Sequence, residues 1–344
     1  MGWRIWRPNR FGLQFNIGRF AGHIHMNTIW PIEHNKLTTE QTEKLHQSLR
    51  SPFKNRLQQF AIDEGLGDYL ASFYIPFASW LGEKQSTVSR TLVVGINGAQ
   101  GSGKSTLSQL TADILTQGFG LNTVVLSIDD IYKTRQQREQ MAIDIHPLFK
   151  TRGVPGTHDT ALGMSLIQQI STLKAGQSLP IPHFDKGNDD RSPKNLWPRC
   201  TGPVDILIVE GWCVGTQPQT TDELTHATNP LEKNEDEKLI WRRTVNEHLK
   251  TDYKEFFGLL DCLIFLQIPN VDCVLKWRGL QEQKLAEKHQ HERHLMSTQK
   301  SLKRFIAHYE RLTLSQLKNM PDIADLTITL DNHHQIKRAL IRRP

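Results

Sequence analysis

The spacing of apolar and polar positions divides the chain into two parts. From about residue 91 onward, short apolar runs rich in β-branched residues alternate with longer segments whose apolar positions recur at helical spacing. Such runs are typical of strands that are buried on both faces in parallel sheets. The predicted strands are Thr91–Ile96, Asn122–Ile128, Val204–Val209, Cys262–Ile268 and Leu326–Leu330, and the predicted helices are Lys104–Gln117, Thr160–Ala175, Val271–Leu295 and Ser301–Leu317. This alternation predicts an α/β fold in which helices flank a parallel sheet in three layers.

The region before residue 91 has a mainly helical pattern. Thr39 is suited to cap a first helix that carries Leu45 and Leu49 on its apolar face. Pro52 is expected to end or kink this helix. An apolar face resumes beyond the proline, and a short polar stretch, residues 82–90, leads into the first predicted strand.

Residues 1–25 differ from both parts. They contain four arginines and five aromatic residues but no acidic residue and no serine. We therefore predict a dispensable N-terminal extension, with a targeting segment or a structural arm as the alternatives. A helical segment, residues 26–90, and an α/β domain, residues 91–344, are expected to follow it.

Composition narrows the class of protein. Hydrophobic residues make up 38% and charged residues 23% of the chain, as in ordinary globular proteins. A membrane-spanning helix needs about 20 consecutive apolar residues, and no apolar run in the sequence approaches this length. The net charge of +6 suits anionic ligands but is too diffuse to predict a nucleic-acid partner. The four cysteines show no metal-binding spacing, and Cys213 and Cys262 fall in or beside apolar runs, which favours a cytoplasmic protein without disulfides.

A phosphate-binding loop directly follows the first predicted strand. Its glycines let backbone N–H groups approach phosphate oxygens, and the helix that begins there adds the positive end of its dipole. Lys104 supplies a charge to the β- and γ-phosphates, and the Ser105 hydroxyl is a ligand for Mg²⁺. The sequence therefore predicts ATP and Mg²⁺ as ligands. The predicted nucleotide-binding residues are Gly98, Ala99, Gln100, Gly101, Ser102, Gly103, Lys104, Ser105 and Thr106.

Acidic residues stand at the ends of the next two predicted strands. Residues just past the carboxyl ends of parallel strands face the ligand crevice of such a sheet. We expect Asp129 to accept a proton from a substrate hydroxyl or to hold Mg²⁺ through water, and Asp130 to point elsewhere. Glu210, at the end of the third strand, is the expected Mg²⁺-orienting acid. The alternatives are an aspartate that caps a helix and a glutamate held by a local hydrogen bond. The predicted catalytic residues are thus Lys104, Asp129 and Glu210, and the predicted metal ligands are Ser105, Asp129 and Glu210.

Loops rich in glycine, proline and polar residues separate these acids, and long structured loops are often functional. His158 is the histidine most expected to touch a substrate, whereas Asp159 could instead cap the helix that follows it.

Five blocks carry a family resemblance: GINGAQGSGKST, SIDDIY, RGVPGTHD, PHFDKGNDDR and ILIVEGW. In this order they resemble the D-glycerate 3-kinase branch of the phosphoribulokinase/uridine kinase/pantothenate kinase superfamily, over roughly residues 91–344. The resemblance implies a P-loop kinase fold with a mobile lid, and transfer of phosphate from ATP to a small-molecule substrate, D-glycerate or a similar polyol or acid. It places Asp129 at the position of the base and Glu210 at that of the strand-end acid. The charged segment 277–293 is the candidate for the implied lid, with Arg278 as its basic residue. Its alternative role is an ordinary solvated helix face.

The same resemblance assigns the substrate side. It places Asp159, Asp185, Lys186 and Arg191 on substrate-side blocks. Because glycerate is an anion, Arg152, Lys186 and Arg191 are the expected cations for its carboxylate.

Three alternatives stay open at this stage. A uridine or pantothenate kinase-like enzyme would share the same loop and acids. A guanine-specific switch protein would require an N-K-x-D segment near the last strands, where the chain has Thr329-Leu-Asp331-Asn332. A non-enzymatic nucleotide-gated protein would not require the substrate-side acid that Asp129 supplies.

Overall fold

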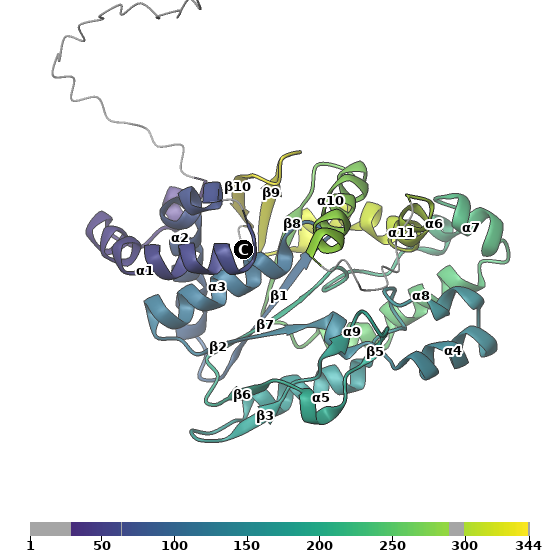
Figure 1. The fold of residues 1–344 in the computed structure, drawn as a ribbon, viewed down its shortest axis with the longest axis horizontal. Helices are drawn as coiled ribbons and strands as arrows, with labels where there is room; N and C mark the ends of the chain where they lie inside the picture. Colours follow the sequence, from purple (N-terminus) through teal and green to yellow (C-terminus); the bar gives the residue numbers. More distant parts are fainter. Residues whose placement is uncertain (1–28, 63, 289–298, 343–344) are drawn as a thin grey trace, which may run out of the picture.

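The computed structural model describes residues 29–62, 64–288 and 299–342, so that the predicted extension, residues 1–25, lies outside the described part. Its centre is a six-stranded sheet in the order β10-β9-β8-β1-β7-β2 (Figure 1). The strands are β1 (Leu92–Gly98), β2 (Thr123–Ser127), β7 (Ile206–Gly211), β8 (Cys262–Gln267), β9 (Leu326–Leu330) and β10 (Ile336–Ile341). The first five pair in parallel and coincide with the five predicted strands.

The sheet is parallel, as predicted, except at one edge. Strand β10 pairs antiparallel to β9 and makes the sheet mixed. The two strands are joined by a tight turn in which the Asp331 carboxylate accepts the N–H groups of His333 and Gln335. A short turn of this kind can join only antiparallel strands. The sequence hides β10 because Lys337 and Arg338 interrupt its apolar positions and lie exposed.

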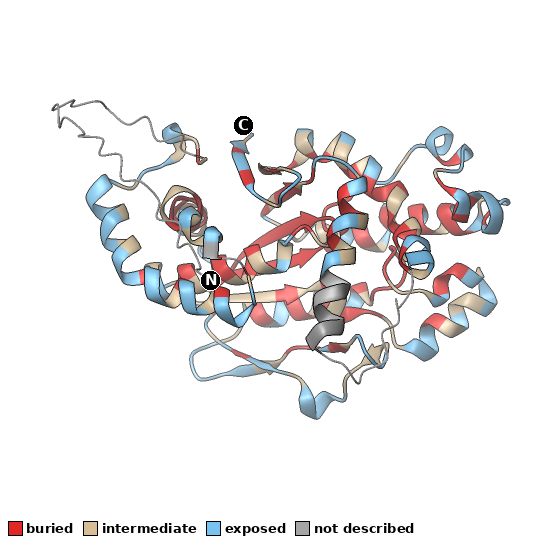
Figure 2. Cartoon of the chain, turned by 45° about the horizontal axis from the view of Figure 1, so that its top comes forward, coloured by how far each residue is buried: buried red, intermediate tan, exposed pale blue. Residues whose placement is uncertain are grey.

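Helices cover both faces of the sheet, as predicted (Figure 1). One face of β1, with Val94 and Ile96, packs in a common core with α3 (Lys104–Phe119) and the N-terminal helices. Val93 faces the opposite core, which contains residues of α5 (Thr160–Ser171) and α9 (Asp252–Phe257). Burial is accordingly concentrated in the central strands, while the outer helices carry most of the exposed positions (Figure 2).

The N-terminal helices form part of the same core. They are α1 (Thr39–Gln59), a π-helical turn (Leu70–Tyr74) and α2 (Ile75–Ser86), so that residues 82–86 are helical rather than part of a linker. Thr38, rather than the predicted Thr39, caps α1 in a capping box with Gln41. Pro52, which was expected to end or kink α1, does not end it, because the helix continues to Gln59. Residues on both sides of it, Leu49 and Phe53, are buried, and Ser48, whose carbonyl loses its usual partner, is exposed to water.

Several elements escaped prediction because they are short or polar. They are α4 (Arg135–Asp144), α6 (Thr221–Thr225), α7 (Pro230–Glu235), α8 (Ile240–Lys250), and the two-stranded pairs β3 (Ser178–Pro180) with β6 (Arg199–Thr201) and β4 (Phe184–Asp185) with β5 (Asp190–Arg191). Helices α10 (Asp272–Lys288) and α11 (Gln299–Ile323) overlap their predicted ranges. Within the described residues, no helix combines the length and apolar character needed to cross a bilayer. All four cysteines are buried and unpaired.

Candidate active site

The predicted phosphate-binding loop connects β1 to α3. Gly101 and Gly103 have φ angles of 77° and 90°, in the left-handed region that favours glycine. A Cβ atom on Gly101 would lie 3.2 Å from the backbone nitrogen of Arg278 and 3.2 Å from Cβ of Trp277. The loop therefore packs directly on the first turns of α10, which brings the predicted lid residue Arg278 next to it.

Ser105 and Glu210 meet at the start of α3. The Ser105 hydroxyl donates to Oε1 of Glu210 at 2.9 Å. Glu210 stands on β7 opposite Ile96 of the neighbouring strand β1, as predicted for the strand-end acid. Its carboxylate is buried, and Oε2 has no hydrogen-bond partner among the described residues. A buried carboxylate oxygen without a partner beside a serine hydroxyl fits the oxygen ligands that Mg²⁺ prefers.

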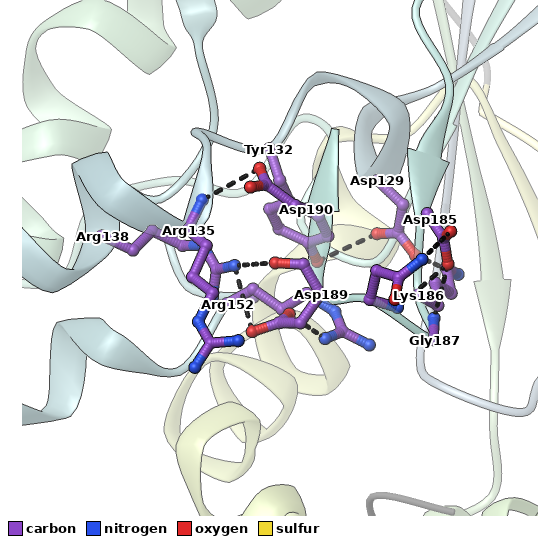
Figure 3. A network of polar contacts seen from close by, with 12 residues as sticks. Asp129, Tyr132, Arg135, Arg138, Arg152, Asp185, Lys186, Gly187, Asp189 and Asp190 are labelled. Atoms are coloured by element: carbon purple, nitrogen blue, oxygen red, sulfur yellow. Dashed lines mark hydrogen bonds and ion pairs between the residues drawn. The ribbon is translucent and has the colours of Figure 1, made fainter. Parts of the chain in front are cut away.

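Asp129 lies just beyond the carboxyl end of β2. Its Oδ1 accepts the Tyr132 hydroxyl at 3.0 Å, and its Oδ2 accepts Nζ of Lys186 at 2.7 Å (Figure 3). Burial alone would raise the pKa of Asp129, but the charges of Lys186 and Lys104 outweigh it and hold this pKa well below its usual range. Asp129 is therefore ionised at neutral pH, and Lys104 of the phosphate-binding loop lies within electrostatic reach of it.

Asp130 points in another direction, as predicted. Its Oδ1 accepts the backbone N–H of Phe184 at 3.0 Å and lies 3.3 Å from Nδ1 of His183. Burial raises the pKa of Asp130, against the opposing effect of the Phe184 N–H group. Asp130 thus anchors the β4–β5 hairpin, while Asp129 faces the loop.

The β4–β5 hairpin carries Lys186 to Asp129. At its tip, Oδ1 of Asp185 accepts the N–H groups of Gly187 and Asn188, at 2.9 and 3.0 Å. Its Oδ2 accepts the side-chain amide of Asn188 at 2.7 Å. The backbone N–H of Asn188 makes the largest contribution to lowering the pKa of Asp185. Both oxygens of this predicted substrate residue therefore hold the turn.

A buried arginine supports the other end of the hairpin. Arg138, 1% exposed, donates to the backbone oxygens of Lys150 and Asp189, at 2.9 and 2.6 Å. Arg152, predicted to bind substrate, forms an ion pair with the Asp189 carboxylate (Figure 3). Its guanidinium group lies over the ring of Phe184. Sequence reasoning missed Arg138, because an arginine on a polar helix gives no signal of burial.

Arg191 and Asp159 also meet. Nη2 of Arg191 donates to the backbone oxygen of Tyr132 at 2.7 Å and to Oδ2 of Asp159 at 3.4 Å. Asp159 also caps α5, because its Oδ1 accepts the N–H of Leu162 at 3.1 Å. The capping role considered for Asp159 is confirmed, and its second oxygen holds Arg191.

His158 lies in the wall beside this network. Its ring stacks on Tyr132 with centroids 4.4 Å apart, and its Nδ1 lies 2.5 Å from the hydroxyl oxygen of Tyr253. Burial lowers the pKa of His158 to about 3, so the ring is neutral at neutral pH. Tyr253 was not predicted, because a tyrosine in a short helix 95 residues away carries no local sign of this contact.

His334, in the β9–β10 turn, was missed as well. Its Nε2 lies 2.7 Å from the backbone oxygen of Gly101, and its ring stacks on Trp277 with centroids 3.7 Å apart. The turn at the end of the sheet thus links the phosphate-binding loop to α10.

The structure therefore brings most of the predicted residues into two adjoining groups. The nucleotide side contains the loop 98–106 with Glu210 and Arg278. The acceptor side contains three ion pairs, Lys186 with Asp129, Arg152 with Asp189 and Arg191 with Asp159, beside His158.

Known proteins resemble this chain in sequence and in fold. The sequence profile of the phosphoribulokinase/uridine kinase family matches residues 93–242. The chain is 26% identical over 226 residues to a chloroplastic D-glycerate 3-kinase from Arabidopsis thaliana, covering 61% of this chain and 47% of that protein. The chain thus spans about half the length of this plant relative.

A fungal relative is covered more fully. An uncharacterized kinase, mug58, from Schizosaccharomyces pombe is 31% identical over 204 residues, which cover 57% of this chain and 72% of that protein. The fold is also similar to that of a D-glycerate 3-kinase from Cryptococcus neoformans, with a TM-score of 0.66 and 22% identity over 79% of this chain and 99% of that one. The chain therefore belongs to the phosphoribulokinase/uridine kinase family.

Proposed function

We propose that this protein transfers the γ-phosphate of ATP to a hydroxyl group of D-glycerate or a closely similar small hydroxy acid. One observation carries the proposal: Asp129, just past the carboxyl end of β2 in the same sheet as β1, lies within electrostatic reach of Lys104 in the phosphate-binding loop, and its pKa is held below the usual range. A kinase requires such a base opposite the phosphate site, and a nucleotide-gated binding protein does not. The similarity to D-glycerate 3-kinases supports the choice of acceptor.

The nucleotide side would hold the triphosphate through backbone N–H groups of the loop and the ammonium group of Lys104. Ser105 and Glu210 would hold Mg²⁺, which when bound neutralises negative charge on the phosphates. Arg278, beside Gly101 on α10, is the proposed basic residue that reaches the phosphates from the lid. Phosphoryl transfer depends mainly on such positioning and charge neutralisation.

Asp129 is the proposed general base. The Tyr132 hydroxyl donates to Oδ1 and fixes this oxygen in place. Oδ2 accepts from the Lys186 ammonium group and can accept a second hydrogen bond from a substrate hydroxyl. Because Lys186 and Lys104 keep Asp129 ionised, the carboxylate can accept the proton as the hydroxyl attacks.

Lys186 is the proposed cation for the carboxylate of the acid substrate. Of the three predicted cations, the side chains of Arg152 and Arg191 are only 13% and 16% exposed and are held by protein carboxylates, whereas that of Lys186 is 60% exposed. A lysine ammonium has three donors, so it can bind a substrate oxygen while it retains Asp129. Arg152 and Arg191 then shape the site rather than bind the acid.

A direct test is a substrate screen with the purified protein. ADP release would be measured with ATP and Mg²⁺ in the presence of D-glycerate, uridine, pantothenate or ribulose 5-phosphate. D-glycerate is expected to give the highest kcat/KM, and chelation of Mg²⁺ is expected to abolish turnover. Preference for uridine would replace the proposed acceptor, and the absence of stimulation by any hydroxyl compound would overturn the kinase proposal.

A further inference from the structure

The hydroxyl oxygen of Tyr253 is surrounded by three possible partners. It accepts the backbone N–H of Gly156 at 3.1 Å and that of His158 at 3.3 Å, and it lies 2.5 Å from Nδ1 of His158. A phenol oxygen has two lone pairs and carries one proton. Since backbone N–H groups can only donate, they fill both acceptor positions. The phenol proton is therefore left for Nδ1 of His158.

The protonation states of the two rings complete this argument. Burial raises the pKa of Tyr253 well above its usual value and lowers that of His158 to about 3, so that both are neutral at neutral pH. A neutral imidazole has a single N–H group. Because Nδ1 accepts, this N–H group is on Nε2.

We propose that Tyr253 holds His158 as the Nε2–H tautomer, and that this N–H group is a positioned donor for an oxygen atom of the acceptor substrate. The donor role rests on the proposed function, whereas the tautomer does not. Nε2 is buried and has no hydrogen-bond partner among the described residues. Unpaired buried donors cost free energy and are uncommon, so a ligand oxygen is the natural partner of this one.

The location of His158 points to the acceptor side. Its ring stacks on Tyr132 at 4.4 Å, and the Tyr132 hydroxyl donates to Oδ1 of Asp129 at 3.0 Å. His158 is thus separated from the proposed base by a single aromatic ring. An acid such as glycerate offers carboxylate and hydroxyl oxygens that can accept its N–H group while a hydroxyl faces Asp129.

Gly156 makes this arrangement possible. It has a φ angle of 100°, and a Cβ atom there would lie 2.6 Å from Cδ2 of His248. Only glycine can therefore bring its own N–H group to Tyr253 at this point of the loop. The Gly156-Thr-His158 segment of the RGVPGTHD block thus serves to fill the acceptor positions of the phenol.

His308 provides an internal standard for the opposite tautomer, with the proton on Nδ1. It is also buried and has a lowered pKa, but its Nδ1 lies 2.9 Å from the backbone oxygen of Arg304. A carbonyl oxygen can only accept, so His308 must carry its proton on Nδ1. His158 and His308 should therefore carry their protons on opposite ring nitrogens.

The tautomers can be read from long-range ¹H–¹⁵N spectra of the full-length protein labelled with ¹⁵N-histidine. His158→Asn and His308→Asn identify the two signals by their loss. We expect the Nε2–H pattern for His158 and the Nδ1–H pattern for His308, and an Nδ1–H pattern for His158 would overturn the proposal. Tyr253→Phe should mix the two tautomers of His158. The matched variant Tyr309→Phe, which removes a buried hydroxyl that donates to the backbone oxygen of Arg152, should leave the His158 signal unchanged.

The donor role is tested with D-glycerate. In His158→Asn, the amide oxygen can still accept from Tyr253, but no donor remains at the Nε2 position. We expect KM for D-glycerate to rise about tenfold while KM for ATP is unchanged, and D-glycerate should shift the Nε2 signal of the wild-type protein. If the wild type phosphorylates D-glycerate and neither effect is seen, the donor role is wrong. If the wild type does not phosphorylate it, the proposed function and the donor role fall together, and the substrate-free spectrum still decides the tautomer.

Discussion

The two sides of the site are built in different ways. The nucleotide side is built mainly from one segment, residues 98–106, in which Gly101 and Gly103 have left-handed backbone conformations, with Glu210 and Arg278 beside it. The acceptor side is assembled from side chains of segments 129–133, 152–159 and 184–191 and from α9. Phosphate binding is thus fixed by local backbone conformation, whereas acceptor binding depends on charge pairs between distant loops.

This difference has a consequence for specificity. Each of the three cations on the acceptor side is balanced by a carboxylate of the protein, so the net charge offered to a substrate is small. A substitution that removes one member of a pair changes the charge seen by the acceptor without affecting the loop. Single substitutions should therefore affect either the binding of the nucleotide or the reaction with the acceptor, but not both equally.

The largest difference between the effect on kcat and the effect on ATP affinity is expected for Asp129→Asn. Loss of a general base lowers kcat by about 10²- to 10⁴-fold, while the loop and Lys104 should retain ATP with nearly unchanged affinity. The test measures kcat, ATP affinity and the Mg²⁺ requirement of the one variant. Recovery of the rate with added Mg²⁺ would show that Asp129 acts as a metal ligand instead. Asp130→Asn is the matched control, since Asn can still accept the N–H of Phe184. A wild-type rate in Asp129→Asn would exclude Asp129 both as general base and as metal ligand.

Lys104→Ala removes the proposed positive charge that binds the phosphates of ATP. We expect kcat/KM to fall by about 10²- to 10³-fold, the usual cost of removing one charge-stabilising group, with an unchanged melting temperature. The effect should appear for every acceptor, because Lys104 is proposed to bind the nucleotide, which all acceptors share. Near-normal turnover by a folded variant would remove the central assignment of the nucleotide side.

Lys186→Met is expected to change the pH dependence of kcat/KM. The Lys186 charge lowers the pKa of Asp129, so its removal must raise this pKa. A base with a raised pKa is protonated at higher pH, and the acidic limb of the kcat/KM profile should therefore move upward. Lys186→Arg retains the charge and should keep the limb near its wild-type position. Coincident profiles for the wild type and Lys186→Met would show that the ion pair does not set the protonation of the base.

The sequence predicts the nucleotide side well because its information is local. The loop, the strand before it and Glu210 at the end of β7 can be recognised from spacing alone, and the structure pairs Ser105 with Glu210. The five parallel strands were also recognisable, because strands buried on both faces are continuously apolar. Strand β10, which is exposed at the sheet edge and carries two charges in sequence, lacks that pattern.

The acceptor side was only partly predictable. Lys186 and Asp129 were selected, but not their contact, because no local pattern records which loop reaches which strand end. Arg138 and Tyr253 were missed for the same reason. Each acts through contacts with backbone groups of distant loops, and such contacts leave no trace in spacing or composition.

The smallest effect is expected at Asp185, where the sequence predicted a substrate contact. In Asp185→Asn, the remaining amide oxygen can still accept the N–H groups of Gly187 and Asn188, so the turn that carries Lys186 should persist. KM for D-glycerate should change by less than about threefold, less than the loss of one neutral hydrogen bond typically costs, because the turn is retained. In Asp185→Ala the turn loses these bonds, and KM should rise further because Lys186 is no longer held in place. A large rise already in Asp185→Asn, with the hairpin intact by ¹⁵N spectra, would show that the carboxylate itself meets the substrate. The acceptor side would then recognise its substrate through an acid as well as through its cations.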